Sequence, residues 1–246
     1  MPEDSTSKVE SLKESTKAKA EELVKSVFPK KVMELQNILE SELLNYDRLP
    51  TIYTDLNIPT PDLANNHEPS KKKRKMDGHD GGEDYIKMQG SAVLALPNGI
   101  SPSNQHIVEI VDKLKPYIRD LVEHANCVKM WITFMIPRIE DGNNFGVSVQ
   151  EDILADVVHA ETESASFSTH IANYFITRGK MVTKLMKYPF VADYRRVVSE
   201  LDEKQFMSLR LTVAEMRNNY CGLNDLILKN LDKIKKPRSH NAENMF

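Results

Sequence analysis

The feature that most constrains this chain is a long run of apolar residues at steps of three and four near its C-terminal end. The run comprises Tyr194, Val197, Val198, Leu201, Leu209, Val213, Met216, Tyr220, Leu223, Ile227, Leu231 and Ile234. This spacing predicts one amphipathic helix, roughly 65 Å long at about 1.5 Å per residue, that ends at Lys235-Lys236-Pro237. Such a helix cannot bury its apolar stripe alone, so we expect other long helices to pack along it.

Two more helical patterns precede this one. The first begins with Ser103 as N-cap and ends before Pro137. Pro116 lies inside it, where we favour a kink over a division into two pieces. The second begins with the capping box Ser148-Val149-Gln150-Glu151 and ends at Tyr188-Pro189. The short connectors at 138–147 and 188–190 force neighbouring helices to run antiparallel. Residues 103–246 are therefore predicted to form three long helices.

The first part of the chain, residues 1–49, supplies the fourth helix of the predicted bundle. A capping box at Ser7-Lys8-Val9-Glu10 is expected to open it, and Pro29 is expected to bend or interrupt it. The predicted fold class is all-α, an elongated antiparallel four-helix bundle. Residues 50–102 hold six of the twelve prolines and five of the nine glycines, so we expect a flexible linker there.

Composition excludes several classes of function. The 33 Lys and Arg nearly balance the 36 Asp and Glu, so net charge points to no nucleic acid or membrane partner. The apolar runs are too short to cross a bilayer. The two cysteines, Cys127 and Cys221, form neither a metal-ligand pair nor a disulfide framework, which fits a reducing compartment.

Catalytic and cofactor motifs are also missing from the sequence. No glycine-rich phosphate loop or dinucleotide pattern occurs, and both cysteines lie in helical patterns, where we interpret them as buried structural thiols. A di-iron bundle needs two Glu-x-x-His pairs, and the nearest match is a single Asp156-x-x-His159. We therefore expect no cofactor, no metal site and no enzymatic activity of the chain itself.

A cluster of five adjacent cations lies inside the predicted linker: Lys71, Lys72, Lys73, Arg74 and Lys75. Burying these charges without partners would be too costly, so they must stay in water. The functional interpretation is a nuclear-import signal. A merely solubilising run is the alternative. Nucleic-acid binding is disfavoured, because no aromatic residues are interleaved with the cations.

The connector between the second and third helices, PRIEDGNNFGVSVQED, is longer than an antiparallel turn needs. Gly142, Asn143, Asn144 and Gly146 tolerate positive φ, so the loop can fold tightly and present polar groups outward. The chain then finishes with a polar tail, 237–246, that ends in Met245-Phe246. A plain connector and a frayed end are one interpretation; a docking loop and an apolar anchor are the other.

Three stretches together carry a resemblance to a known family: PRIEDGNNFGVSVQED, ITRGKMVTKLMKYPFVADYRR and ILKNLDKIKKPRSHNAENMF. They resemble the REG family of heptameric proteasome activators, most closely its nuclear gamma branch. The resemblance extends from Phe28 to Phe246 and is weakest in the first twenty residues and the linker. Phe246 departs from the tyrosine expected at that end, which bears on the affinity of the tail rather than on its mode of action.

The resemblance implies a ring of seven four-helix subunits that stacks on the α-subunit ring of the proteasome core particle. Such a cap uses neither ATP nor ubiquitin and admits peptides and small disordered proteins; it is found in the nucleus and partly in the cytoplasm. It implies an activation loop comprising Arg138, Glu140, Asp141, Gly142, Asn143, Asn144, Phe145 and Gly146 and a binding tail comprising Glu243, Asn244, Met245 and Phe246. It also implies that Lys180 affects which peptidase activity rises. The alternative without the resemblance is a nuclear helical scaffold or adaptor.

Overall fold

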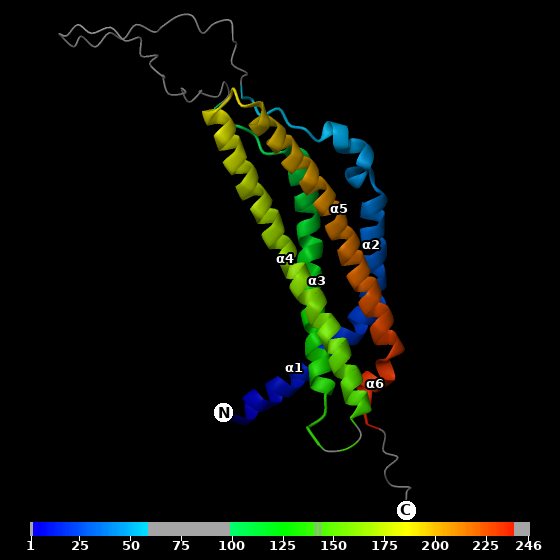
Figure 1. Ribbon diagram of the computed structural model, residues 1–246. Helices are drawn as coiled ribbons and strands as arrows, with labels where there is room; N and C mark the ends of the chain where they lie inside the picture. Colours follow the sequence, from blue (N-terminus) through cyan, green and yellow to red (C-terminus); the bar gives the residue numbers. More distant parts are fainter. Residues whose placement is uncertain (1, 59–98, 141, 143, 239–246) are drawn as a thin grey trace, which may run out of the picture.

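The computed structural model describes residues 2–58, 99–140, 142 and 144–238, with side chains from residue 5 onward. Within these residues every regular element is helical. The three longest are α3 (Gln105–Met135), α4 (Phe145–Lys187) and α5 (Ala192–Lys229), and α2 (Phe28–Glu40) packs against α5. Figure 1 shows that, in chain order, α2, α3, α4 and α5 run up, down, up and down along one long axis. The predicted elongated antiparallel four-helix bundle is confirmed.

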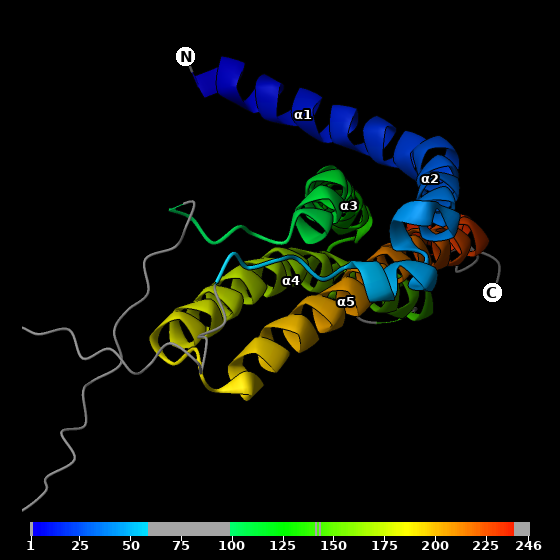
Figure 2. The same ribbon diagram turned by 90° about the horizontal axis from the view of Figure 1, so that it is seen from above.

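The N-terminal helix is interrupted where proline predicted it. Helix α1 (Pro2–Glu22) leads into a π-helical turn, η1 (Leu23–Val27), and α2 carries Pro29 in its first turn. Figure 2 shows that α1 leaves the bundle at a steep angle to α2. The amide of Asn224 in α5 donates to the carbonyl of Val24 at 2.6 Å, which holds the turn against the bundle. The capping box predicted at Ser7 is wrong, because the helix already includes the preceding residues.

The linker is shorter at its N-terminal side than the sequence predicted. Two 3₁₀ turns, η2 (Glu42–Leu44) and η3 (Tyr46–Thr51), follow α2, and an extended segment continues to residue 58. Ile52, Leu56 and Ile58 are each at most 6% exposed. Leu56 and Ile58 pack with apolar residues of α4 and α5, so this segment is part of the folded body. Residues 59–98, with the basic run at 71–75, lie outside the described residues.

Two predicted helix starts need correction. The N-cap of α3 is Asn104 rather than Ser103: its Oδ1 accepts from the backbone N–H of Ile107 at 3.2 Å. Helix α4 begins at Phe145, three residues before the predicted capping box. The Ser148 hydroxyl donates to the carbonyl of Phe145 at 2.7 Å, so it serves as a residue inside the first turn.

The helix ends agree better with the prediction. Helix α3 continues through Pro116 as one element and ends at Met135, and α4 ends at Lys187. The predicted last helix is divided: α5 ends at Lys229, and a short helix, α6 (Leu231–Lys235), follows. At the break, the Asn230 side chain donates to the carbonyl of Leu226 at 2.8 Å, which satisfies one free acceptor at the end of α5.

One hydrophobic core extends along the bundle and contains residues from α1 through α6. Its largest fully buried side chains include Trp131, Tyr220, Phe28 and Phe206. The rings of Phe28 and Tyr220 meet edge to face, with centroids 5.0 Å apart, which joins the start of α2 to α5. The Tyr220 hydroxyl in turn hydrogen-bonds Nδ1 of His124 in α3 at 2.9 Å.

Candidate functional site

The bundle has two ends with different contents. The loop between α3 and α4 and the segment after α6 lie together at one end, the lower end in Figure 1. The segments that lead into and out of residues 59–98 lie at the opposite end. The predicted activation loop and the root of the predicted tail therefore share one end of the subunit, and the segments that border the basic run share the other.

Two large apolar side chains, one in the loop and one in the first turn of α4, are exposed to solvent. Ile139 is fully exposed and Phe145 is 71% exposed, although both are large and hydrophobic. Gly142 has a φ of +112°, a conformation that L side chains rarely adopt. Any residue with a Cβ atom would strain the backbone at this turn of the loop. Phe145 and Gly146, which were predicted as loop residues, belong to the first turn of α4. Asp141 and Asn143 lie outside the described residues.

A set of polar contacts joins the loop to the start of the tail. Glu140 forms ion pairs with Arg138 and with Nη1 of Arg238, the latter at 2.8 Å. Nη2 of Arg238 also donates to Oδ1 of Asn144 at 3.1 Å. Arg238 was not among the predicted site residues, because nothing in its local sequence reveals partners almost a hundred residues away.

Gly146 is where the tail crosses α4. A Cβ atom placed on Gly146 would lie 2.0 Å from the carbonyl oxygen of Pro237, far inside van der Waals contact. No other residue fits at this position unless the Pro237 backbone moves. Sequence reasoning assigned Gly146 to loop flexibility, whereas the structure uses it for close approach of two backbones.

Gln150 fixes the helices behind this contact. Its side chain is fully buried, and its Nε2 donates to the carbonyl of Met135 at 3.0 Å and to that of Ile234 at 2.7 Å. These carbonyls belong to the last turns of α3 and α6, where no following helical N–H is available to them. One amide thus joins the helix before the loop, the helix after it and the helix before the tail.

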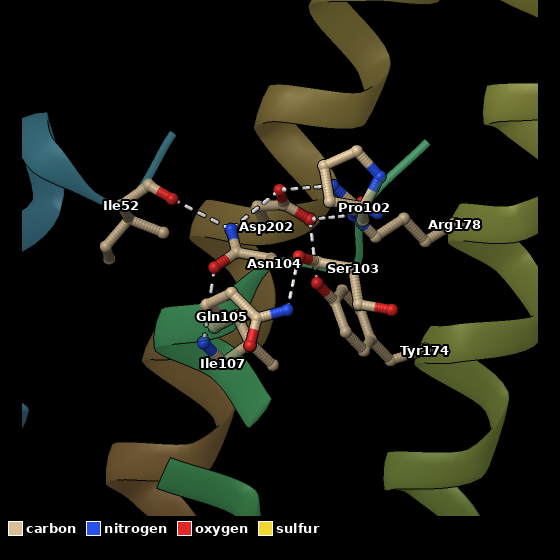
Figure 3. Close-up of polar contacts among 9 residues, drawn as sticks. All are labelled: Ile52, Pro102, Ser103, Asn104, Gln105, Ile107, Tyr174, Arg178 and Asp202. Carbon is tan, nitrogen blue, oxygen red and sulfur yellow. Dashed lines mark hydrogen bonds and ion pairs between the residues drawn. The ribbon is translucent and has the colours of Figure 1, made fainter. Parts of the chain in front are cut away.

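The opposite end contains a buried polar cluster centred on Asp202 of α5 (Figure 3). The carboxylate accepts from Nε of Arg178 at 2.8 Å, from the Tyr174 hydroxyl at 2.7 Å and from Nδ2 of Asn104 at 2.8 Å. Asp202 is 2% exposed and Asn104 is fully buried. Burial and the adjacent carboxylate raise the pKa of Tyr174 far above its usual range, so this phenol remains a donor.

The same cluster holds the two backbone segments that border residues 59–98. Nδ2 of Asn104 donates to the carbonyl of Ile52 at 2.8 Å, and Nη1 of Arg178 donates to the carbonyl of Pro102 at 3.1 Å. Figure 3 shows Ile52 and Pro102 beside the cluster. The backbone on either side of residues 59–98 is therefore attached to the bundle, on one side through Asn104 to Asp202 of α5 and on the other through Arg178 of α4.

The other predicted positions are distributed as follows. Lys180 is exposed on α4, two residues beyond Arg178 and far along the helix from the loop. Residues 243–246 and 71–75 lie outside the described part of the chain. Cys127 is half-buried, but Cys221 is exposed, so the prediction of two buried thiols is wrong for Cys221.

Two kinds of site are absent from the described ranges. Among those residues, no group of three or more His, Cys, Asp or Glu side chains could hold a metal ion. No helix there is both long and apolar enough to cross a membrane. One end of the bundle brings together the exposed side chains of Ile139 and Phe145 and the start of the tail at Arg238.

Comparison with known proteins identifies the family to which this chain is similar. Family models for the C-terminal and N-terminal parts of proteasome activator PA28 match residues 100–244 and 3–63. Proteasome activator complex subunit 3 from Homo sapiens and from Gallus gallus are each 49% identical over 246 residues, covering 97% of this chain and 95% of theirs.

Solved structures show the same fold. The 11S subunit of the Plasmodium falciparum proteasome, PA28, matches with a TM-score of 0.76 and 30% identity over 96% of both chains. PA26, solved in complex with an archaeal 20S proteasome, matches with a TM-score of 0.62 at 13% identity, covering 94% of this chain and 92% of that one, and supports the fold alone. With both family models and these relatives in agreement, the chain belongs to the PA28 (REG) family of proteasome activators.

Proposed function

We propose that this chain is one subunit of a heptameric ring that caps the proteasome core particle, is anchored by its C-terminal tails and opens the gate with its activation loops. The observation that carries this proposal is the contact between Glu140 in the loop and Arg238 at the start of the tail, at one end of the bundle. A binding tail and a gate-opening loop that act on the same partner surface must project from the same face of the subunit. The chain supplies no catalytic residue and uses no ATP, ubiquitin or cofactor.

The tail provides the anchor. Burying Met245 and Phe246 would stabilise the complex by roughly 3–5 kcal/mol before the entropy of ordering the tail is subtracted, so a single tail binds weakly. In a ring, each insertion after the first is intramolecular, and avidity rises by about 100-fold or more. Ring assembly is therefore part of the mechanism.

The loop provides the lever. A contact that is equally favourable with the open and the closed gate would shift nothing, so the loop must bind the open form better. The exposed side chains of Ile139 and Phe145, with residues 140–144 between them, are the groups available for this difference. The proposed partner surface is the α-subunit ring of the core particle, and the admitted substrates are peptides and small disordered proteins.

We assign the chain to the nucleus, with a cytoplasmic fraction, on the basis of the basic run Lys71–Lys75. We also propose that Lys180, through its exposed ammonium group, affects which peptidase activity rises. Neither feature belongs to the loop or to the start of the tail. We therefore expect substitutions there to change the location of the protein or the selectivity of activation, without affecting binding to the core particle.

Two variants distinguish binding by the tail from gate opening by the loop. Deletion of residues 243–246 should abolish binding to purified core particle and with it the stimulated hydrolysis of fluorogenic peptides. Asn143→Trp should leave binding intact and remove stimulation, because the loop would no longer fit the open gate. Full stimulation by the tailless ring, or a monomer when the native chain is weighed in solution, would overturn the proposal.

A further inference from the structure

We propose that Arg238 is a positioning residue that couples the tail to the activation loop, so that insertion of the tail sets the position of the loop. The proposal rests on the proposed function and adds to it a specific connection within each subunit. Arg238 belongs neither to the predicted activation loop nor to the predicted binding tail, residues 243–246, yet its side chain contacts both Glu140 and Asn144.

The first support is the geometry of the guanidinium group. One nitrogen, Nη1, contacts the Glu140 carboxylate at 2.8 Å, and the other, Nη2, contacts the Asn144 amide oxygen at 3.1 Å. Glu140 lies in the middle of the loop, and Asn144 is the N-cap of α4. Asn144 also donates to the backbone carbonyl of Glu140 at 3.4 Å. A planar fork holding both groups fixes their separation, which a single point charge cannot do.

The second support is that the backbone before Arg238 is fixed. Pro237 lies directly on Gly146, with no space for a Cβ atom between them, and Gln150 holds the carbonyl of Ile234 three residues earlier. Arg238 therefore projects from a defined point on the bundle. A displacement of the tail beyond it can reach the loop through the side chain of Arg238 rather than being lost in a mobile hinge.

The third support is the arrangement of charge around Glu140. This carboxylate is shared by Arg138 within the loop and by Arg238 at the tail root. If the contact with Arg238 is lost, Glu140 keeps only a partner that moves with the loop itself. The loop then loses its connection to the tail but keeps its composition. Such a connection couples the position of the tail to the position of the loop.

The test is a double-mutant cycle on assembled, full-length rings. Arg238→Gln, Glu140→Gln and the double variant are titrated against purified core particle, and the half-saturating concentration and the maximal rate of peptide hydrolysis are measured separately. Each single variant should lower the maximal rate by about twofold to fivefold, the range expected for a partly exposed ion pair, while half-saturation changes by less than about twofold. The double variant should lose no more than either single variant.

Arg238→Lys should recover only part of the maximal rate, because an ammonium group can pair with Glu140 but cannot hold Asn144 in the same fork. Arg196→Gln is the matched control, since Arg196 pairs with Glu200 within α5, and it should match the wild type. Equal maximal rates for wild type and Arg238→Gln would overturn the coupling. So would losses that multiply in the double variant, or a change in half-saturation alone.

A second measurement does not depend on stimulation. In free rings, Arg238→Gln should speed hydrogen exchange of backbone amides in residues 138–144, whereas Arg196→Gln should not. Unchanged exchange in Arg238→Gln would overturn the coupling even if the ring activates. If wild-type rings fail to stimulate the core particle, the proposed function fails, while the exchange result still decides whether Arg238 fixes the loop.

Discussion

The Asp202 carboxylate of α5 and the Arg178 guanidinium of α4 form an ion pair with both side chains almost entirely buried, at 2% and 7% exposure and an Nε–Oδ1 distance of 2.8 Å. Tyr174 and Asn104 each donate a further hydrogen bond to Asp202, and Nη2 of Arg178 donates a second one at 3.4 Å. Desolvating two charges is costly, and only a fully satisfied arrangement compensates for it. The cluster therefore selects one register of α4 against α5 and holds the residues around Pro102 in place.

We expect Asp202→Asn to lower the free energy of unfolding by about 3–5 kcal/mol, because it leaves the Arg178 charge buried without its counter-ion. Denaturant unfolding followed by circular dichroism, at fixed chain concentration, measures this loss. The matched control is Glu200→Gln, which breaks the exposed pair with Arg196 and should cost less than about 1 kcal/mol. A loss of under about 1 kcal/mol for Asp202→Asn would contradict the structural role assigned to the cluster.

Gly142 and Gly222 make a second comparison. A Cβ atom added to either glycine would have no neighbouring atom within 4 Å, and of the two only Gly142 has a positive φ. Gly142→Ala should strain the loop by about 1–3 kcal/mol and reduce maximal stimulation without reducing binding. Gly222→Ala, in α5, should instead raise stability by about 0.5–1 kcal/mol. Peptide hydrolysis at saturating ring concentration and thermal unfolding are the measurements. Full stimulation by Gly142→Ala would show that the turn at this position is unimportant for gate opening.

His124 predicts a pH dependence of stability. Burial lowers its pKa below the ordinary value; Asp120 opposes the shift, and Lys31 and Lys19 add to it. Because the unfolded chain binds the proton more readily, the free energy of unfolding should fall as pH drops from about 7.5 through the unfolded pKa of 6.5 towards the folded pKa. Below the folded pKa this contribution should stop changing.

The measurement for His124 is the slope of unfolding free energy against pH in wild type and in His124→Phe. The substitution removes the hydrogen bond to Tyr220 and lowers stability at every pH, so only the change of slope is diagnostic. A flatter profile below neutral pH is expected for the variant. Parallel profiles would mean that His124 does not carry the dependence.

Replacing all five cations at 71–75 with glutamine should leave the protein in the cytoplasm, because the import machinery recognises clustered positive charge. Replacing the four lysines of the run with arginine keeps the charge and should keep the protein in the nucleus. Fluorescence imaging of both variants in intact cells is the measurement. Nuclear accumulation of the glutamine variant would contradict the import assignment.

The helices were predictable because a bundle is built from a pattern that each helix carries by itself. Apolar residues at steps of three and four marked α3, α4 and α5, and prolines marked the breaks near residues 29, 137 and 189. The predicted starts at Ser7, Ser103 and Ser148 were wrong, since a serine followed three residues later by a glutamate can equally lie within a helix, and Asn104 outcompeted its neighbour as a cap.

The site was predictable only in part. A loop rich in glycine and asparagine was visible in the sequence, and the family resemblance gave it a role. Gly146, Gln150 and Arg238 each contact a residue that is far away in the sequence: Pro237, Ile234 and Glu140, respectively. No local pattern could reveal these contacts. The same is true of Asp202, whose sequence neighbourhood is that of an ordinary exposed helix.

In the proposed mechanism, the ring opens the closed core particle without taking part in the hydrolysis. The most direct test is hydrolysis of a short fluorogenic peptide by latent core particle, without ATP, with and without saturating amounts of the full-length ring, while complex formation is followed in the same sample. We expect a severalfold higher rate of hydrolysis in the complex. A complex that forms but hydrolyses the peptide no faster than the latent core particle would contradict it.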